Sequence, residues 1–220
     1  LLMRIVLNHM APADLGRTVL RAALFAGCIA LAACAEQKKP NADAATLAAA
    51  SYRHDGPAAL TLITVINNRS GQGGHTALMI NASERIIFDP AGSFYADVVP
   101  EKDDVLYGVY PAVERAYHSA HARSTHHVMT QRLEVTSEQA QIAYQLAVTN
   151  GRVAGAYCAR STVAILKQIP GFEDLNETFY PVKLADQFAK FPGVVTKRYY
   201  EDDSEDLQEG LAKGNDALNG

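Results

Sequence analysis

Runs of aliphatic and β-branched residues in the first half of the chain constrain its fold most. Residues 60–66 read Leu-Thr-Leu-Ile-Thr-Val-Ile and predict a buried strand, which two asparagines close. Two further runs, residues 75–81 and 85–89, are separated by only three residues. Because so short a connection joins neighbouring antiparallel strands, these two runs predict a β-hairpin. We therefore expect an antiparallel sheet at the centre of the fold.

The second half of the chain adds strands and most of the helices. Further strands are expected at residues 105–110, 128–135 and 194–200. Helices are expected from the capping box Thr136–Gln139 to about Thr149, from about Cys158 to before Pro170, and from Val182 to Phe191. The alternation predicts an α+β domain over residues 58–200, an antiparallel sheet with helices packed on it.

Composition excludes several classes of protein. The chain has 220 residues, of which 48% are hydrophobic and 20% charged, enough apolar material for a packed core. The 20 Lys and Arg face 24 Asp and Glu, so the formal net charge is −4 and no nucleic-acid partner is expected. Three cysteines are too few for a disulfide scaffold.

The first 33 residues have the layout of a secretory signal peptide. Arg4, Arg17 and Arg21 precede an apolar run at residues 22–33. A helix of about 12 residues is about 18 Å long, too short for a hydrocarbon core of about 30 Å. A basic start, a short apolar core and small residues at its end are typical of a signal peptide. The alternative is a buried apolar helix that happens to end in cysteine.

The end of this run, Leu31-Ala-Ala-Cys34, resembles the lipobox of bacterial lipoproteins. The resemblance implies cleavage before Cys34, a lipid on its sulfur and acylation of the new amine, for example by palmitate. Because Ala35 rather than Asp follows, it also implies the periplasmic face of the outer membrane. Residues 34–57 are then a lipidated cysteine and tether, and residues 201–220 are expected to be an acidic flexible tail.

Three residues at element boundaries have the chemistry of a thiol-dependent acyl-transfer site. Cys158 lies at the expected start of a helix, where unpaired backbone amides favour a thiolate. His75 opens one strand of the hairpin and Asp89 closes the other. If the hairpin turns at residues 82–83, facing residues sum to about 165, and His75 and Asp89 sum to 164. An imidazole positioned by a carboxylate is the base that such a thiol needs.

Each of these residues also has a purely structural interpretation. A single helix cysteine is commonly a small core residue, which is the alternative for Cys158. His75 could be a structural histidine with satisfied hydrogen bonds, and Asp89, before a proline, could simply start a turn. If Asp89 points away from His75, Asn81 or Glu84 becomes the candidate for orienting the imidazole.

Three segments together resemble a known family. They are Gly74-His75-Thr-Ala-Leu, Phe88-Asp89-Pro-Ala-Gly-Ser and Tyr157-Cys158-Ala-Arg-Ser-Thr-Val. They resemble the circularly permuted branch of the NlpC-type papain-like hydrolases, over roughly residues 58–170. In that branch the histidine strand precedes the cysteine helix, and relatives include bacterial lipoproteins and lecithin:retinol acyltransferase-like enzymes.

The resemblance implies a permuted papain-like fold with Cys158 as nucleophile and His75 as base. The backbone N–H groups of Cys158 and Ala159 would hold the oxyanion. Relatives use His, Asn, Gln or Glu as the third polar group, so Asp89 departs from their pattern. The implied enzyme is a cysteine peptidase, amidase or acyltransferase without metal or cofactor, acting on peptidoglycan peptides or on lipid acyl esters. The alternative is a catalytically silent lipoprotein whose cleft binds wall peptide or a partner protein.

A histidine-rich segment lies between the hairpin and the first expected helix. It contains His118, His121, His126 and His127. No Cys, Asp or Glu lies among them, and their spacing matches no closed zinc motif. We therefore expect a surface loop here rather than a metal site.

Overall fold

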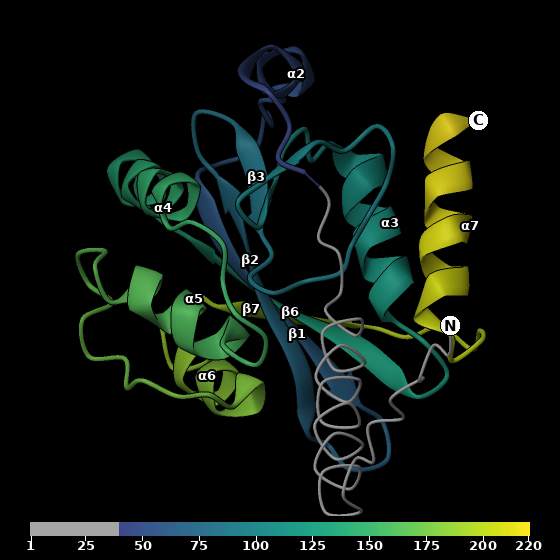
Figure 1. Ribbon diagram of the computed structural model, residues 1–220. Helices are drawn as coiled ribbons and strands as arrows, with labels where there is room; N and C mark the ends of the chain where they lie inside the picture. The colour runs from purple at the N-terminus through teal and green to yellow at the C-terminus, as the bar shows by residue number, and fades with distance from the viewer. Residues whose placement is uncertain (1–39) are drawn as a thin grey trace, which may run out of the picture. The chain divides into compact units, whose positions relative to one another are not determined.

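The computed structural model describes residues 40–220, and these residues have an α+β fold built on one antiparallel sheet (Figure 1). The strand order is β4-β5-β3-β2-β1-β6-β7. The strands are β1 (Ala59–Asn67), β2 (Gly73–Asn81), β3 (Arg85–Phe88), β4 (Glu101–Lys102), β5 (Val105–Leu106), β6 (His126–Glu134) and β7 (Val195–Tyr199). The helices are α2 (Ala44–Ala50), α3 (Pro111–His121), α4 (Ser137–Thr149), α5 (Cys158–Leu166), α6 (Pro181–Phe188) and α7 (Leu207–Asn219). The α+β class with an antiparallel sheet, expected from the sequence, is therefore confirmed.

Helices cover both faces of the sheet, in two separate layers (Figure 1). Side chains alternate along β1, the central strand, so its aliphatic run feeds both layers. Leu60 and Leu62 join the core that contains residues of α4, α5 and α6. Ile63 joins the core that contains residues of α3 and α7. The strand that the sequence marks as most apolar is thus buried on both sides.

The predicted hairpin is formed by β2 and β3. Leu78 pairs with Phe88 and Ile80 with Ile86, so facing residues sum to 166, one more than expected. β3 pairs with β2 only over Leu78–Asn81. The first half of β2, which contains His75, therefore extends beyond β3 and leaves its backbone on that side available to other groups.

The expected helices and strands of the second half are present with shifted ends. α4 begins at the predicted capping box, in which Gln139 N donates to Thr136 Oγ1 at 3.1 Å and Thr136 N donates to Gln139 Oε1 at 2.9 Å. The prediction of a strand over residues 105–110 is wrong in its length, because β5 ends at Leu106. Gly108 has a φ of +69°, a left-handed conformation that turns the chain away from the sheet.

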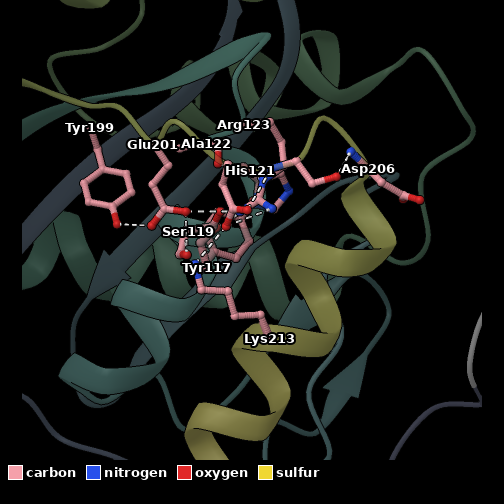
Figure 2. Close-up of polar contacts among 11 residues, drawn as sticks. Tyr117, Ser119, His121, Ala122, Arg123, Tyr199, Glu201, Asp206 and Lys213 are labelled. Atoms are coloured by element: carbon pink, nitrogen blue, oxygen red, sulfur yellow. Dashed lines mark hydrogen bonds and ion pairs between the residues drawn. The ribbon is translucent and has the colours of Figure 1, made fainter.

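The prediction of a flexible tail at residues 201–220 is wrong for α7. Leu211 is buried against the α3 side of the sheet, with Leu207 and Leu218 packed beside it. Figure 2 shows the polar contacts that hold the segment before the helix: Ser119 Oγ donates to Glu201 at 3.0 Å, and Arg123 Nη2 donates to the same carboxylate at 3.1 Å. The acidic run is therefore paired with α3 and the residues after it.

The expected surface loop of histidines is also corrected. His118 and His121 lie in the last turn of α3, and His126 and His127 open β6. His121 is 8% exposed because α3 lies along the sheet. Among residues 40–220, no three His, Cys, Asp or Glu side chains come close enough to hold a metal ion.

Two sequence predictions concern the N-terminal part of the chain. The signal peptide and Cys34 lie outside the described residues. Within the expected tether, residues 44–50 form the helix α2, whose N-cap Asp43 accepts from Thr46 N at 2.7 Å. In the part of the chain that the structure describes, no helix is long and apolar enough to span a bilayer.

Candidate active site

The structure brings together the three residues that the sequence singles out. His75 comes from β2, Asp89 follows directly after β3, and Cys158 is the first residue of α5. His75 Nε2 lies 2.6 Å from Asp89 Oδ1. The same imidazole is hydrogen-bonded to Cys158. Since Nε2 is taken by Asp89, Nδ1 is the ring nitrogen left for the thiol.

Cys158 reaches His75 at the part of β2 that β3 leaves uncovered. Helix α5 packs on β2, which places its N-terminus beside this strand. The backbone N–H of Thr76, next to His75, donates to the sulfur, and so does that of Ala159 in the first turn of α5. The sulfur therefore receives donors from both the strand and the helix.

The Asp89 carboxylate is held on two sides. The hydroxyl of Tyr117, a fully buried residue of α3, donates to Asp89 Oδ1 at 2.6 Å. Gly92 N donates to the backbone oxygen of Asp89 at 2.9 Å and closes the turn after β3. A Cβ on Gly92 would overlap the Asp89 carboxylate, so only glycine fits at this position.

A second imidazole lies against this group. The ring of His121 stacks on that of His75, with centroids 5.9 Å apart and planes 11° apart. His121 Nδ1 lies 2.8 Å from the Tyr117 carbonyl oxygen, which can only accept, so Nδ1 carries the hydrogen. Burial lowers the pKa of His121, and the charge of Asp89 opposes this without reversing it. His121 is therefore neutral near pH 7.

The charges of the pair reinforce each other. Burial alone would lower the pKa of His75, but the charge and hydrogen bond of Asp89, together with Cys158, raise it to about 10. Burial alone would raise the pKa of Asp89, but His75, His121 and the Tyr117 hydroxyl lower it to about 2. At neutral pH the site thus contains an imidazolium beside an aspartate.

The thiol is shifted toward its ionised form. Burial raises the pKa of Cys158, but the hydrogen bond and charge of His75 and the N–H groups of Thr76 and Ala159 outweigh it. The net pKa lies below that of an ordinary thiol. An ionised sulfur next to an imidazolium is the reactive state of a cysteine nucleophile.

The surroundings of the pair are part open and part aromatic. A cavity of about 350 Å³ opens beside His75 and is also lined by Ser93, His121 and Arg123. Tyr157, the residue before the thiol, is 42% exposed. Its ring packs edge-on against Phe179 with centroids 5.3 Å apart. A ligand that approaches Cys158 past Tyr157 and Phe179 would contact aromatic surface.

The alternatives for orienting the imidazole are engaged elsewhere. Asn81 Nδ2 donates to the carbonyl oxygens of Gly56 and Pro57, at 3.1 and 2.7 Å. Glu84 accepts from the Tyr144 hydroxyl. Asp89 is therefore the carboxylate that contacts His75.

Sequence reasoning missed the contribution of α3 to the site. Tyr117 and His121 come from the segment interpreted as a loop. The sequence does contain a helix signal there, because Pro111 is followed by apolar residues at Val113, Tyr117 and Ala120 with helical spacing.

In comparisons with known proteins, no family model, no curated protein and no solved structure matched the chain.

Proposed function

We propose that this protein is a cysteine hydrolase or acyltransferase with a permuted papain-like architecture. The observation that carries the proposal is the continuous hydrogen-bonded series from Cys158 through His75 to Asp89. A buried structural histidine also needs a hydrogen-bond partner, but it does not need both a thiol and a carboxylate. The chain order, with the histidine strand first and the cysteine helix late, supports the permuted arrangement.

The geometry supports a two-step acyl transfer. The Cys158 thiolate attacks the carbonyl carbon of an amide or ester, a C–S bond forms, and the carbonyl oxygen becomes an oxyanion. Backbone N–H groups of Cys158 and Ala159, at the start of α5, would stabilise this charge. As the oxyanion collapses, the imidazolium of His75 gives its proton to the departing amine or alkoxide, and an acyl-enzyme remains.

The second step regenerates the thiolate. His75, now neutral, takes a proton from water in a hydrolase or from an alcohol or amine in an acyltransferase. The resulting nucleophile attacks the thioester, and the C–S bond breaks. Asp89 stabilises the imidazolium and holds the ring in one tautomer throughout, without itself being protonated.

The proposed substrate and location come from the sequence. The lipobox at Cys34 supports a lipid-anchored protein on the periplasmic face of a bacterial outer membrane. Peptidoglycan peptide bonds are the first proposed substrate and lipid acyl esters the second. A catalytically silent binding protein is the competing candidate, and it is favoured by the low exposure of the pair, 8% for Cys158 and 16% for the His75 side chain.

The pH dependence of thiol alkylation tests the proposal. Iodoacetamide should label the wild-type protein at Cys158 at pH values well below about 8.5, where an ordinary thiol is protonated. The rate should stay level until the imidazolium is lost near its pKa of about 10. In His75→Ala the midpoint should move to higher pH, because only the N–H groups of Thr76 and Ala159 then oppose the effect of burial on the Cys158 pKa. Cys158→Ala is the control for labelling at this site.

Two results would decide against the enzyme. Labelling that requires denaturant would show that the sulfur is inaccessible, and an unchanged midpoint in His75→Ala would show that the two groups do not interact.

The substrate is tested by incubating purified sacculi with the protein and analysing the released fragments by mass spectrometry, with Cys158→Ala as the inactive match.

A further inference from the structure

A second cavity lies on the α3 side of the sheet, away from Cys158 and His75. It has a volume of about 390 Å³. We call it the cationic cavity and define it by six of its lining residues: Thr61, Arg85, Glu114, Thr130, Arg132 and Lys197. Its lining includes neither Cys158, His75 nor Asp89.

The floor of the cationic cavity is the sheet itself. Thr61 on β1 faces Arg132 on β6, and Thr130 on β6 faces Lys197 on β7. Residues that face each other across antiparallel strands point to the same side of the sheet. Arg132 and Lys197 therefore rise from neighbouring strands on one surface, which they share with Thr61 and Thr130.

Arg85, at the start of β3, forms one wall and has unused donors. It is only 3% exposed. Its Nη2 donates to Glu114, and its Nε lies 3.3 Å from the Met79 sulfur, a weak acceptor. Among the described residues, nothing bonds to its Nη1. A buried guanidinium with free N–H groups at the edge of a cavity is suited to hold an oxyanion.

The charges in the cationic cavity do not balance. Arg85, Arg132 and Lys197 contribute three positive charges, and Glu114 contributes one negative charge. Arg132 also pairs with Glu134 at 2.8 Å, but that carboxylate side chain is 63% exposed. Lys197 has no partner in the part of the chain that the structure describes. Positive charge thus remains in excess even when Glu134 is counted.

We propose that the cationic cavity binds the carboxylate or phosphate group of a small ligand. Arg85 and Arg132 would donate to its oxygens, Lys197 would neutralise the remaining charge, and the Thr61 hydroxyl would complete the contacts. A planar carboxylate and a tetrahedral phosphate each present two oxygens that a guanidinium can bind with two parallel hydrogen bonds. The proposal does not depend on the activity proposed for Cys158.

An NMR titration of the isotope-labelled full-length protein tests it. Inorganic phosphate and acetate are added in separate experiments at low ionic strength. We expect saturable shifts of the Thr61 and Thr130 amides with at least one of the two anions. A preference for phosphate would identify a phosphorylated ligand, and a preference for acetate a carboxylic acid.

Two neighbouring residues of β7 provide matched variants. Lys197→Gln removes a charge from the cavity and should weaken binding about tenfold, since an ionised hydrogen-bond partner is lost. Arg198→Gln removes a charge from the adjacent residue, which points to the other face, and should change affinity less than about twofold. No saturable shift with either anion, or equal losses in the two variants, would overturn the proposal.

Discussion

At the scale of single residues, the Asp89 carboxylate controls the state of the candidate site. One of its oxygens accepts from both His75 and Tyr117, and Gly92 lies against the other. With a pKa of about 2, Asp89 stays ionised over the whole range in which the thiol is reactive. It therefore fixes hydrogen on His75 Nε2 and leaves Nδ1 toward Cys158.

Tyr117→Phe should separate positioning from packing. The variant keeps the ring and removes one hydrogen bond to a charged oxygen, so turnover should fall about tenfold and the free energy of unfolding by about 1–3 kcal/mol. The pKa of the Asp89 carboxyl should also rise, because the Tyr117 hydroxyl helps to lower it. Steady-state kinetics across pH and urea denaturation provide the measurements.

Asp89→Asn is the comparison for this variant. It should reduce turnover much further, about 10⁴-fold in a comparable triad. If Tyr117→Phe lowers stability while leaving the rate and its pH profile unchanged, Tyr117 has only a structural role.

The sequence identifies part of the site for a clear physical reason. His75, Asp89 and Cys158 lie at element boundaries, and their types have recognisable chemistry. The contacts of Tyr117 and Gly92 with Asp89 depend on how α3 and the turn fold back onto the strand. Local patterns do not contain that information, so these residues could not be found in the same way.

At the scale of elements, α7 shows how tertiary packing overrides local signals. Its glycines have low helix propensity, and an acidic run precedes it, both typical of a tail. In the structure Gly214 lies against Ala116 of α3, and a Cβ on Gly210 would come within 2.7 Å of the Arg123 guanidinium. The glycines allow close contact between α7 and its neighbours. The hairpin of β2 and β3, by contrast, depends on a short local connection and was predicted correctly.

Leu211→Ala should test this packing. Leu211 is 7% exposed, so its truncation should lower the free energy of unfolding by about 2–4 kcal/mol in urea denaturation. Gln208→Ala, on an exposed position of the same helix, should change it by less than about 0.5 kcal/mol. Equal effects of the two variants would mean that α7 is not anchored through this side chain.

At the scale of the whole molecule, the candidate site lies between the two helical layers. The α4–α6 layer supplies Cys158, and the α3 layer supplies Tyr117 and His121. The sequence predicts the sheet and the helices of the second half because their periodicities are strong. It does not predict which layer each helix joins, since that depends on contacts between distant segments.

The proposed lipid anchor also concerns the whole molecule. Cys34 precedes Pro40, the first described residue, by six positions in the sequence. Cys34→Ser should remove the lipid attachment site and shift the protein out of the membrane fraction or leave an uncleaved precursor. Cys28→Ser, six residues upstream, should remain membrane-bound. Fractionation with mass spectrometry of the N-terminus distinguishes these forms, and a cleaved, membrane-bound Cys34→Ser protein would contradict the lipobox assignment.

The late position of Cys158 has a consequence for biosynthesis. The chain emerges from the ribosome with His75, Asp89 and Tyr117 first, while the thiol follows only after most of the sheet has been translated. Until α5 docks beside the uncovered part of β2, the sulfur has neither the imidazole nor the Thr76 amide as a neighbour. A truncated or half-folded chain therefore contains only an ordinary thiol. The reactivity proposed for Cys158 would thus arise only when the fold is finished.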